Sequence, residues 1–81
     1  MTEELKSLID FYNNITIPGT EGIVKINTMF IPSESEESTP VAVMGILDEE
    51  KYKDLEKYNL ELVLKVIDQC KEANEAYKKL I

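Results

Sequence analysis

The sequence predicts a single small α+β domain over residues 1–81, with the element order α-β-β-α. Three observations lead to this class. Apolar residues recur at helical spacing near the N-terminus, two β-prone apolar segments follow, and residues 48–80 contain neither glycine nor proline. A chain of this length forms one domain with a thin core, because it buries only about 60% of the surface that its unfolded form exposes.

The first helix is expected at residues 3–13. Thr2 is a suitable N-cap, and Glu3 and Glu4 place negative charge in the first turn, where the helix dipole favours it. Apolar residues then follow at helical spacing: Leu5, Leu8, Ile9 and Tyr12. The helix should end near Asn14, because asparagine tolerates the left-handed backbone conformation that often terminates helices.

Two strands are expected at residues 22–31 and 41–47. The first strand alternates, with Val24, Ile26, Thr28 and Phe30 on one face, and the second strand is apolar on both faces. The nine residues between the strands are too few for a parallel crossover, which needs a dozen or more. The strands should therefore pair as an antiparallel hairpin.

The connection at residues 32–40 is long for a hairpin, whose loops usually have two to five residues. Pro32 and Pro40 lack the N–H that a ladder needs, so pairing should end at both. The acidic, serine-rich segment between them is expected to be flexible, and its charge should keep the hairpin tip soluble.

The last predicted helix fills residues 48–80, with Asp48 as its N-cap. A continuous helix of about 32 residues would measure roughly 48 Å, which exceeds the ~30 Å diameter of a domain this size. Two alternatives follow. The helix bends near Tyr58 and Asn59, or it projects from the domain and packs against another chain.

The apolar residues of this helix favour the second alternative. They form two adjacent stripes, which is more apolar surface than one helix and two strands would cover. We therefore expect a homo-oligomer, either a dimer or a larger assembly. The expected interface residues are Leu60, Val63, Leu64, Ile67 and Tyr77.

The composition argues against an enzyme. The chain has no histidine and no arginine, so it lacks an imidazole base, a Ser–His or Cys–His pair and a bidentate anion clamp. Cys70, the single cysteine, lies on an apolar stripe and should be a small buried hydrophobe. The glutamates of the loop lack the ligand spacing and the glycine of a calcium-binding loop. We expect no cofactor and no metal site.

The net charge of −7 arises from nine lysines and sixteen acidic residues. Such a chain repels phosphate backbones and anionic lipids, so we expect no direct binding to nucleic acid or membranes. The lone cysteine, and the lack of a signal-like start or a long apolar run, predict a cytoplasmic protein. A small acidic chain without catalytic residues is typical of phage and mobile-element accessory proteins.

The leading functional hypothesis is a viral or mobile-element inhibitor that binds a basic, nucleic-acid-handling host protein without catalysis. Its expected partner-binding residues are Glu34, Glu36, Glu37, Asp48, Glu49, Glu50, Asp54 and Glu56. A second hypothesis is an oligomer that sequesters a metabolite or nucleotide signal, with polar groups from Lys25, Asn27 and Thr28. A third is a structural subunit of a larger assembly.

Overall fold

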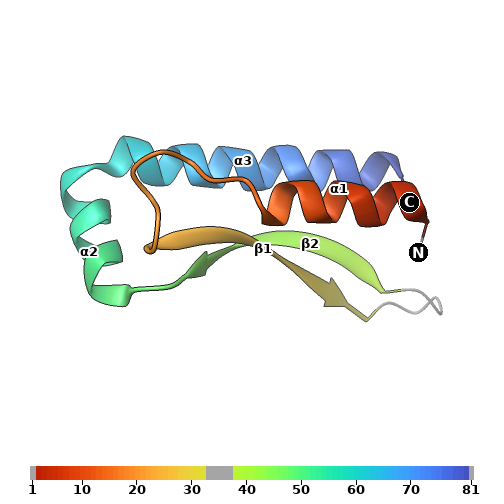
Figure 1. Cartoon of the computed structure of the whole chain (residues 1–81), viewed down its shortest axis with the longest axis horizontal. Helices are drawn as coiled ribbons and strands as arrows, with labels where there is room; N and C mark the ends of the chain where they lie inside the picture. Colours follow the sequence, from red (N-terminus) through yellow and green to blue (C-terminus); the bar gives the residue numbers. More distant parts are fainter. Residues whose placement is uncertain (1, 33–37, 81) are drawn as a thin grey trace.

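The computed structural model describes residues 2–32 and 38–80, which form two layers (Figure 1). The elements are α1 (Glu3–Asn13), β1 (Val24–Ile31), β2 (Thr39–Ile46), α2 (Glu49–Tyr58) and α3 (Leu60–Lys79). Helices α1 and α3 lie side by side over one face of the β1–β2 hairpin, and α2 crosses one end of it. The α+β class and the antiparallel hairpin are confirmed, but the last predicted helix is divided in two.

Helix α1 has the bounds that the sequence predicts, because local signals define both of its ends. The hydroxyl of Thr2 accepts a hydrogen bond from the backbone N–H of Leu5, at 3.2 Å. At the other end the side-chain amide of Asn14 donates to the carbonyl of Asp10, at 2.7 Å. The buried side chains of α1 are Leu5, Ile9 and Tyr12, as the helical spacing predicts.

The hairpin pairs further toward its tip than predicted, since Phe30 is opposite Pro40 and Ile31 is opposite Thr39. The prediction that Pro40 ends the pairing is wrong. The N–H of Leu47 donates to the carbonyl of Ile23 at 2.7 Å, and hydrogen-bonded pairs recur every second residue from that point. Pro40 therefore belongs to a non-hydrogen-bonded pair. A backbone N–H at this position would point away from β1, so its absence removes no hydrogen bond of the hairpin.

Asn59 separates α2 from α3. Its backbone angles, φ −146° and ψ 61°, lie outside the helical region. The continuous, projecting helix favoured from the sequence is therefore wrong, and the alternative of a bend near Tyr58 and Asn59 is confirmed. The break allows α3 to fold back over the sheet, where it contacts β2 extensively.

The core lies between the inner face of the hairpin and the two long helices. Tyr77 is fully buried there, and its ring meets that of Tyr12 edge-on, with the ring centroids 6.0 Å apart. The hydroxyl of Thr28 donates to Oδ1 of Asn13 at 2.9 Å, so its contact of 3.1 Å with the Tyr77 hydroxyl uses the tyrosine as donor. These bonds join α1, β1 and α3 at one point.

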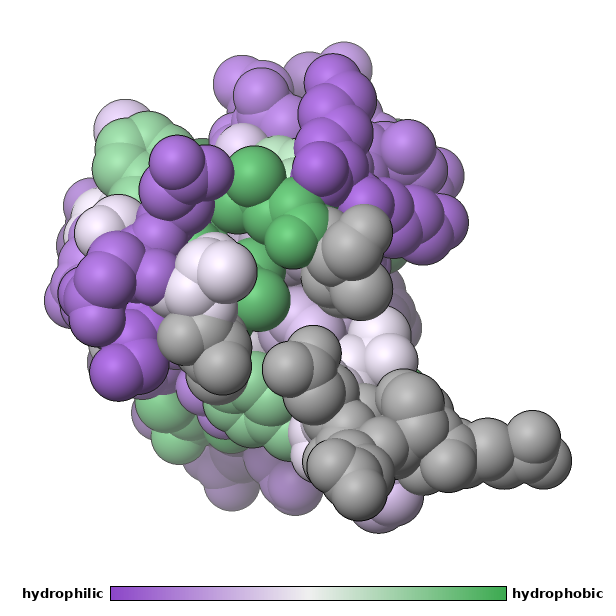
Figure 2. All heavy atoms as spheres, turned by 90° about the vertical axis from the view of Figure 1, so that its right-hand side faces the viewer, coloured by the Kyte–Doolittle hydropathy of each residue, from purple (hydrophilic) through white to green (hydrophobic). Residues whose placement is uncertain are grey.

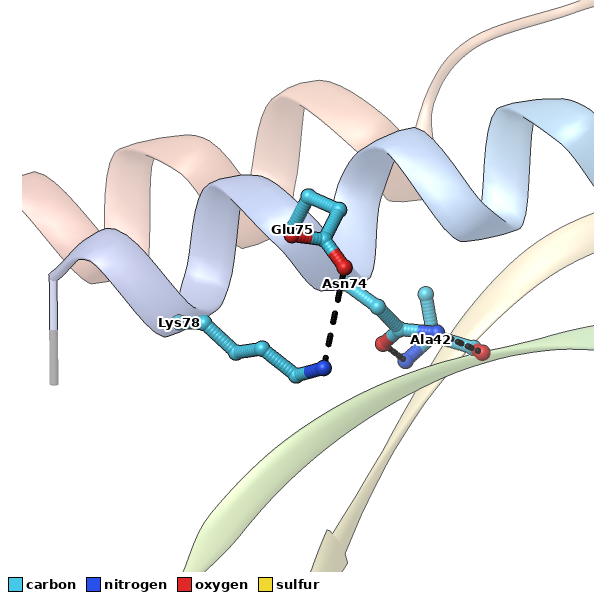
Figure 3. A network of polar contacts seen from close by, with 4 residues as sticks. All are labelled: Ala42, Asn74, Glu75 and Lys78. Atoms are coloured by element: carbon cyan, nitrogen blue, oxygen red, sulfur yellow. Dashed lines mark hydrogen bonds and ion pairs between the residues drawn. The ribbon is translucent and has the colours of Figure 1, made fainter.

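The outer edge of β2 is covered by α3. Asn74 lies beside Ala42, with its Oδ1 accepting from the backbone N–H at 2.7 Å and its Nδ2 donating to the carbonyl at 3.2 Å (Figure 3). Both backbone groups of Ala42 therefore point away from β1, which agrees with the alternation set by Ile23 and Leu47. Asn74 takes the place that a third strand would occupy.

Candidate binding surface

The structure describes five of the eight acidic residues that are predicted to bind a partner. Glu34, Glu36 and Glu37 lie outside the described residues. The last pair of the hairpin before them, Ile31 and Thr39, lies at the end of the sheet opposite to α2 (Figure 1). Strand β2, with eight residues, measures about 26 Å and separates this end from Asp48. The members of the predicted set that the structure describes are those that cap or lie on α2: Asp48, Glu49, Glu50, Asp54 and Glu56.

Helix α2 buries none of its residues, and of the other elements it contacts chiefly α3. Asp48 is its N-cap, with a carboxylate that accepts from the N–H of Lys51 at 3.1 Å. Residues 46–64 contain six acidic residues and three lysines, so they contribute −3 of the net charge of −7. In the part of the chain that the structure describes, none of these acids forms an ion pair.

Exposed apolar side chains gather at the same end of the molecule. Nine large apolar side chains are strongly exposed among the described residues, and five of them flank or end α2. These five are Ile46, Leu47, Tyr58, Leu60 and Leu64. We call these five residues, together with Asp48, Glu49, Glu50, Asp54 and Glu56, the α2 surface.

Tyr58 is the most exposed of the nine, at 75%. The Nζ of Lys57 lies 5.2 Å from the centroid of its ring, a distance at which a cation is attracted by the aromatic face. This end of the protein thus presents carboxylates, aliphatic side chains and the ring of Tyr58, which interacts with the ammonium group of Lys57. These groups together suit a basic protein segment that also has apolar side chains.

The residues expected at an oligomer interface divide between surface and core. Leu60 and Leu64 are exposed, whereas Val63 and Tyr77 are buried within the chain itself. Tyr77 does not face a partner chain, as its place in the expected interface would require, because α1 and β1 enclose it. One side of the start of α3 is also covered, since a Cβ on Gly19 would lie only 2.9 Å from Cδ2 of Leu62. Of the expected set, Leu60 and Leu64 are the strongly exposed members.

The polar residues expected around a small molecule are also separated. The Thr28 hydroxyl is occupied by Asn13 and Tyr77, while Lys25 and Asn27 are exposed on strand β1. An apolar groove of about 460 Å³ lies between α1 and the end of α3, floored by Leu8, Phe11 and Leu80 and flanked by Glu3, Glu4 and Ser7. Figure 2 shows this end of the molecule, with apolar residues framed by hydrophilic ones. The groove is open and does not enclose a ligand.

Cys70 is buried, as predicted, and burial raises the pKa of its thiol. A protonated buried thiol is a poor nucleophile. Within residues 2–32 and 38–80, no group of three or more acidic, cysteine or histidine residues is arranged to hold a metal ion. No helix in the same ranges is long and apolar enough to cross a membrane.

Sequence reasoning named the acids of the α2 surface but missed three of its apolar members, Ile46, Leu47 and Tyr58. Ile46 and Leu47 fall in the strand expected at residues 41–47, and Tyr58 falls in the last predicted helix, so none of them is expected at a binding surface. A usable signal was present, because a strand that is apolar on both faces in a two-stranded sheet must expose some of its side chains. Comparisons with protein-family models, with curated proteins and with solved structures find no match for this chain.

Proposed function

We propose that the protein is a non-catalytic binding protein and that the α2 surface engages a basic protein partner. The observation that supports this most strongly is the coincidence of two features at one end of the molecule. Acids without ion-pair partners among the described residues lie on α2, and five of the nine strongly exposed large apolar side chains lie on α2 or in the segments next to it. Monomeric proteins rarely leave such a group uncovered unless something binds there.

The two kinds of side chain have separate roles in this proposal. The carboxylates of Glu49, Glu50 and Asp54 accelerate association by steering a basic partner toward α2, an effect that weakens with salt. The apolar side chains of Tyr58 and Leu64 hold the partner once it has docked, because apolar and aromatic contacts dominate the centre of interfaces.

The partner class follows from the same chemistry. A basic surface that is large enough to attract these acids is typical of proteins that handle nucleic acids. Binding of the α2 surface there would occupy groups that otherwise contact phosphates, and so would inhibit the partner by competition. This is the expected action of a viral or mobile-element accessory protein on a host enzyme.

The test is affinity capture from a host extract with two matched variants, followed by mass spectrometry. The test variant combines Glu49→Gln, Glu50→Gln and Asp54→Asn. The control combines Glu3→Gln, Glu4→Gln and Asp10→Asn, which also removes two charges from the first turn of a helix and one further along. The expected result is a basic protein retained by the wild type and the control but lost from the test variant.

Two results would contradict the proposal. One is a partner that both variants retain equally, which would place binding elsewhere on the chain. The other is a captured partner with an acidic surface. Added duplex DNA should also displace the captured protein, since the proposal has the α2 surface and phosphates competing for the same basic groups.

A further inference from the structure

The two outer edges of the hairpin are not equivalent. Asn74 satisfies both backbone groups of Ala42 on the β2 edge. The register pairs Ala42 with Thr28, so the backbone groups of Thr28 point away from β2 as well, toward the outer edge of β1. The same alternation applies to Ile26 and Phe30. None of these three residues has a backbone partner on that side among the described residues.

The open part of this edge is near the hairpin tip. Ile26 is only 1% exposed and is enclosed by the core. Further along, Met29, Phe30 and Ile31 are 57%, 45% and 50% exposed, and Thr28 is half-buried. We call residues 28–31 the β1 edge. Uncharged edge strands with exposed apolar side chains readily pair with another strand.

The charge distribution indicates which strand would pair there. Strands β1 and β2 contain none of the sixteen acidic residues, and Lys25 is the only charged residue in either. Two copies with a net charge of −7 repel each other least where their contact surface contains no carboxylates. A basic partner, by contrast, would be drawn to the acids of the α2 surface rather than to this edge.

We propose that the β1 edge pairs with the β1 edge of a second copy of this chain, antiparallel about a two-fold axis at Met29. Thr28 of each copy then exchanges hydrogen bonds with Phe30 of the other, which gives a four-stranded sheet in the order β2-β1-β1-β2. The contact is self-complementary, as a two-fold interface requires. A contact four residues long buries less than the roughly 800 Å² per partner of a standard interface, so the dimer is weak and forms at high concentration.

The test is sedimentation equilibrium of the full chain from micromolar to millimolar concentration. The expected mass rises from 9.3 kDa toward about twice that value. Phe30→Pro should hold the mass at 9.3 kDa, because it removes an N–H that faces the outer edge and no bond of the hairpin. Pro40, directly opposite, shows that this pair of positions accommodates proline.

A second variant keeps the test decisive if Phe30→Pro fails to fold. Met29→Lys alters an exposed side chain and places two like charges opposite each other at the axis, so it should also abolish the dimer. The control is Phe11→Lys, an equally exposed apolar residue on α1, which should dimerise like the wild type. A mass of 9.3 kDa at every concentration overturns the proposal, as does a dimer that survives Met29→Lys.

Discussion

Asn74 on α3 binds both backbone polar groups of Ala42 on β2, at 2.7 and 3.2 Å. One side chain thus closes an edge of the sheet and fixes the position of α3 against it. Asn74→Leu keeps a similar volume but leaves both groups of Ala42 unpaired. Each buried, unpaired group costs about 1–3 kcal/mol. We expect a loss of at least that size in the free energy of unfolding, measured with urea.

The control for this prediction is Glu75→Leu at the next position of α3. Glu75 is exposed, and its single ion pair with Lys78 spans 3.6 Å (Figure 3). Exposed substitutions usually change stability by no more than about ±0.5 kcal/mol. Equal urea midpoints for the two variants would show that Asn74 does not hold the sheet edge.

The hydroxyl of Tyr77 provides a second test of the core. Tyr77→Phe removes its hydrogen bond to Thr28 without changing the packing of the ring. A hydrogen bond of this kind contributes about 0.5–1.5 kcal/mol, so the variant should lose stability by that amount. Tyr58→Phe, at a residue that is 75% exposed, should unfold like the wild type.

Val63 and Leu64 are adjacent in α3, but Val63 is buried and Leu64 is exposed. A glutamate substitution at each position should therefore have different effects on folding. Val63 is 3% exposed, so Val63→Glu buries a charge without a partner and should prevent folding. Leu64 is 48% exposed, so Leu64→Glu should leave the helical circular dichroism and the melting temperature nearly unchanged. If Leu64→Glu also unfolded the protein, an interface along α3 would have to be considered again.

The buried thiol of Cys70 makes stability depend on pH in the alkaline range. Its pKa is raised in the folded state by burial, so the folded protein favours the protonated form. The stabilisation is complete below the ordinary thiol pKa of about 8.5 and is lost as the pH rises through the folded-state pKa. The free energy of unfolding should therefore fall more steeply above about pH 8.5 in the wild type than in Cys70→Ala. Rapid labelling of the native thiol at pH 7 would contradict this burial.

Helix α1 could be predicted to the residue because the signals that define it are adjacent in the chain. Thr2 caps its start, and Asn14 closes its end. The sequence leaves the break at Asn59 as one of two alternatives, because asparagine is tolerated within helices and the turn is required by the packing of α3 on the sheet. Local propensity was sufficient for the first case and insufficient for the second.

The candidate site could be predicted only in part, for a related reason. The acids of α2 are visible in the sequence, but their place at the end of the sheet away from the hairpin tip depends on the length of β2. The position of Pro40 in the ladder depends on which backbone groups face the partner strand, and the residue types do not encode this alternation. Burial of Tyr77 likewise required α1 to be placed beside α3.

The two acidic groups of the chain should contribute differently to partner binding. The described hairpin ends at the pair Ile31 and Thr39, about 26 Å of strand from Asp48. We therefore expect that replacing Glu34, Glu36 and Glu37 by glutamine leaves the association rate of an α2-bound partner almost unchanged. The same change should leave the melting temperature within the range of surface substitutions. Biosensor kinetics on the captured partner would measure the first effect, and thermal unfolding the second.

The most direct test of the α2 surface is the association rate of the captured partner at low and at physiological salt. The variant with Glu49→Gln, Glu50→Gln and Asp54→Asn should associate more slowly at low salt and show a flatter salt dependence, because exposed charges act mainly on the on-rate. The α1 control should match the wild type at both salt concentrations. If the two variants associate at the same rate, with the same dependence on salt, then the acids of α2 do not steer the partner and the proposed function is wrong.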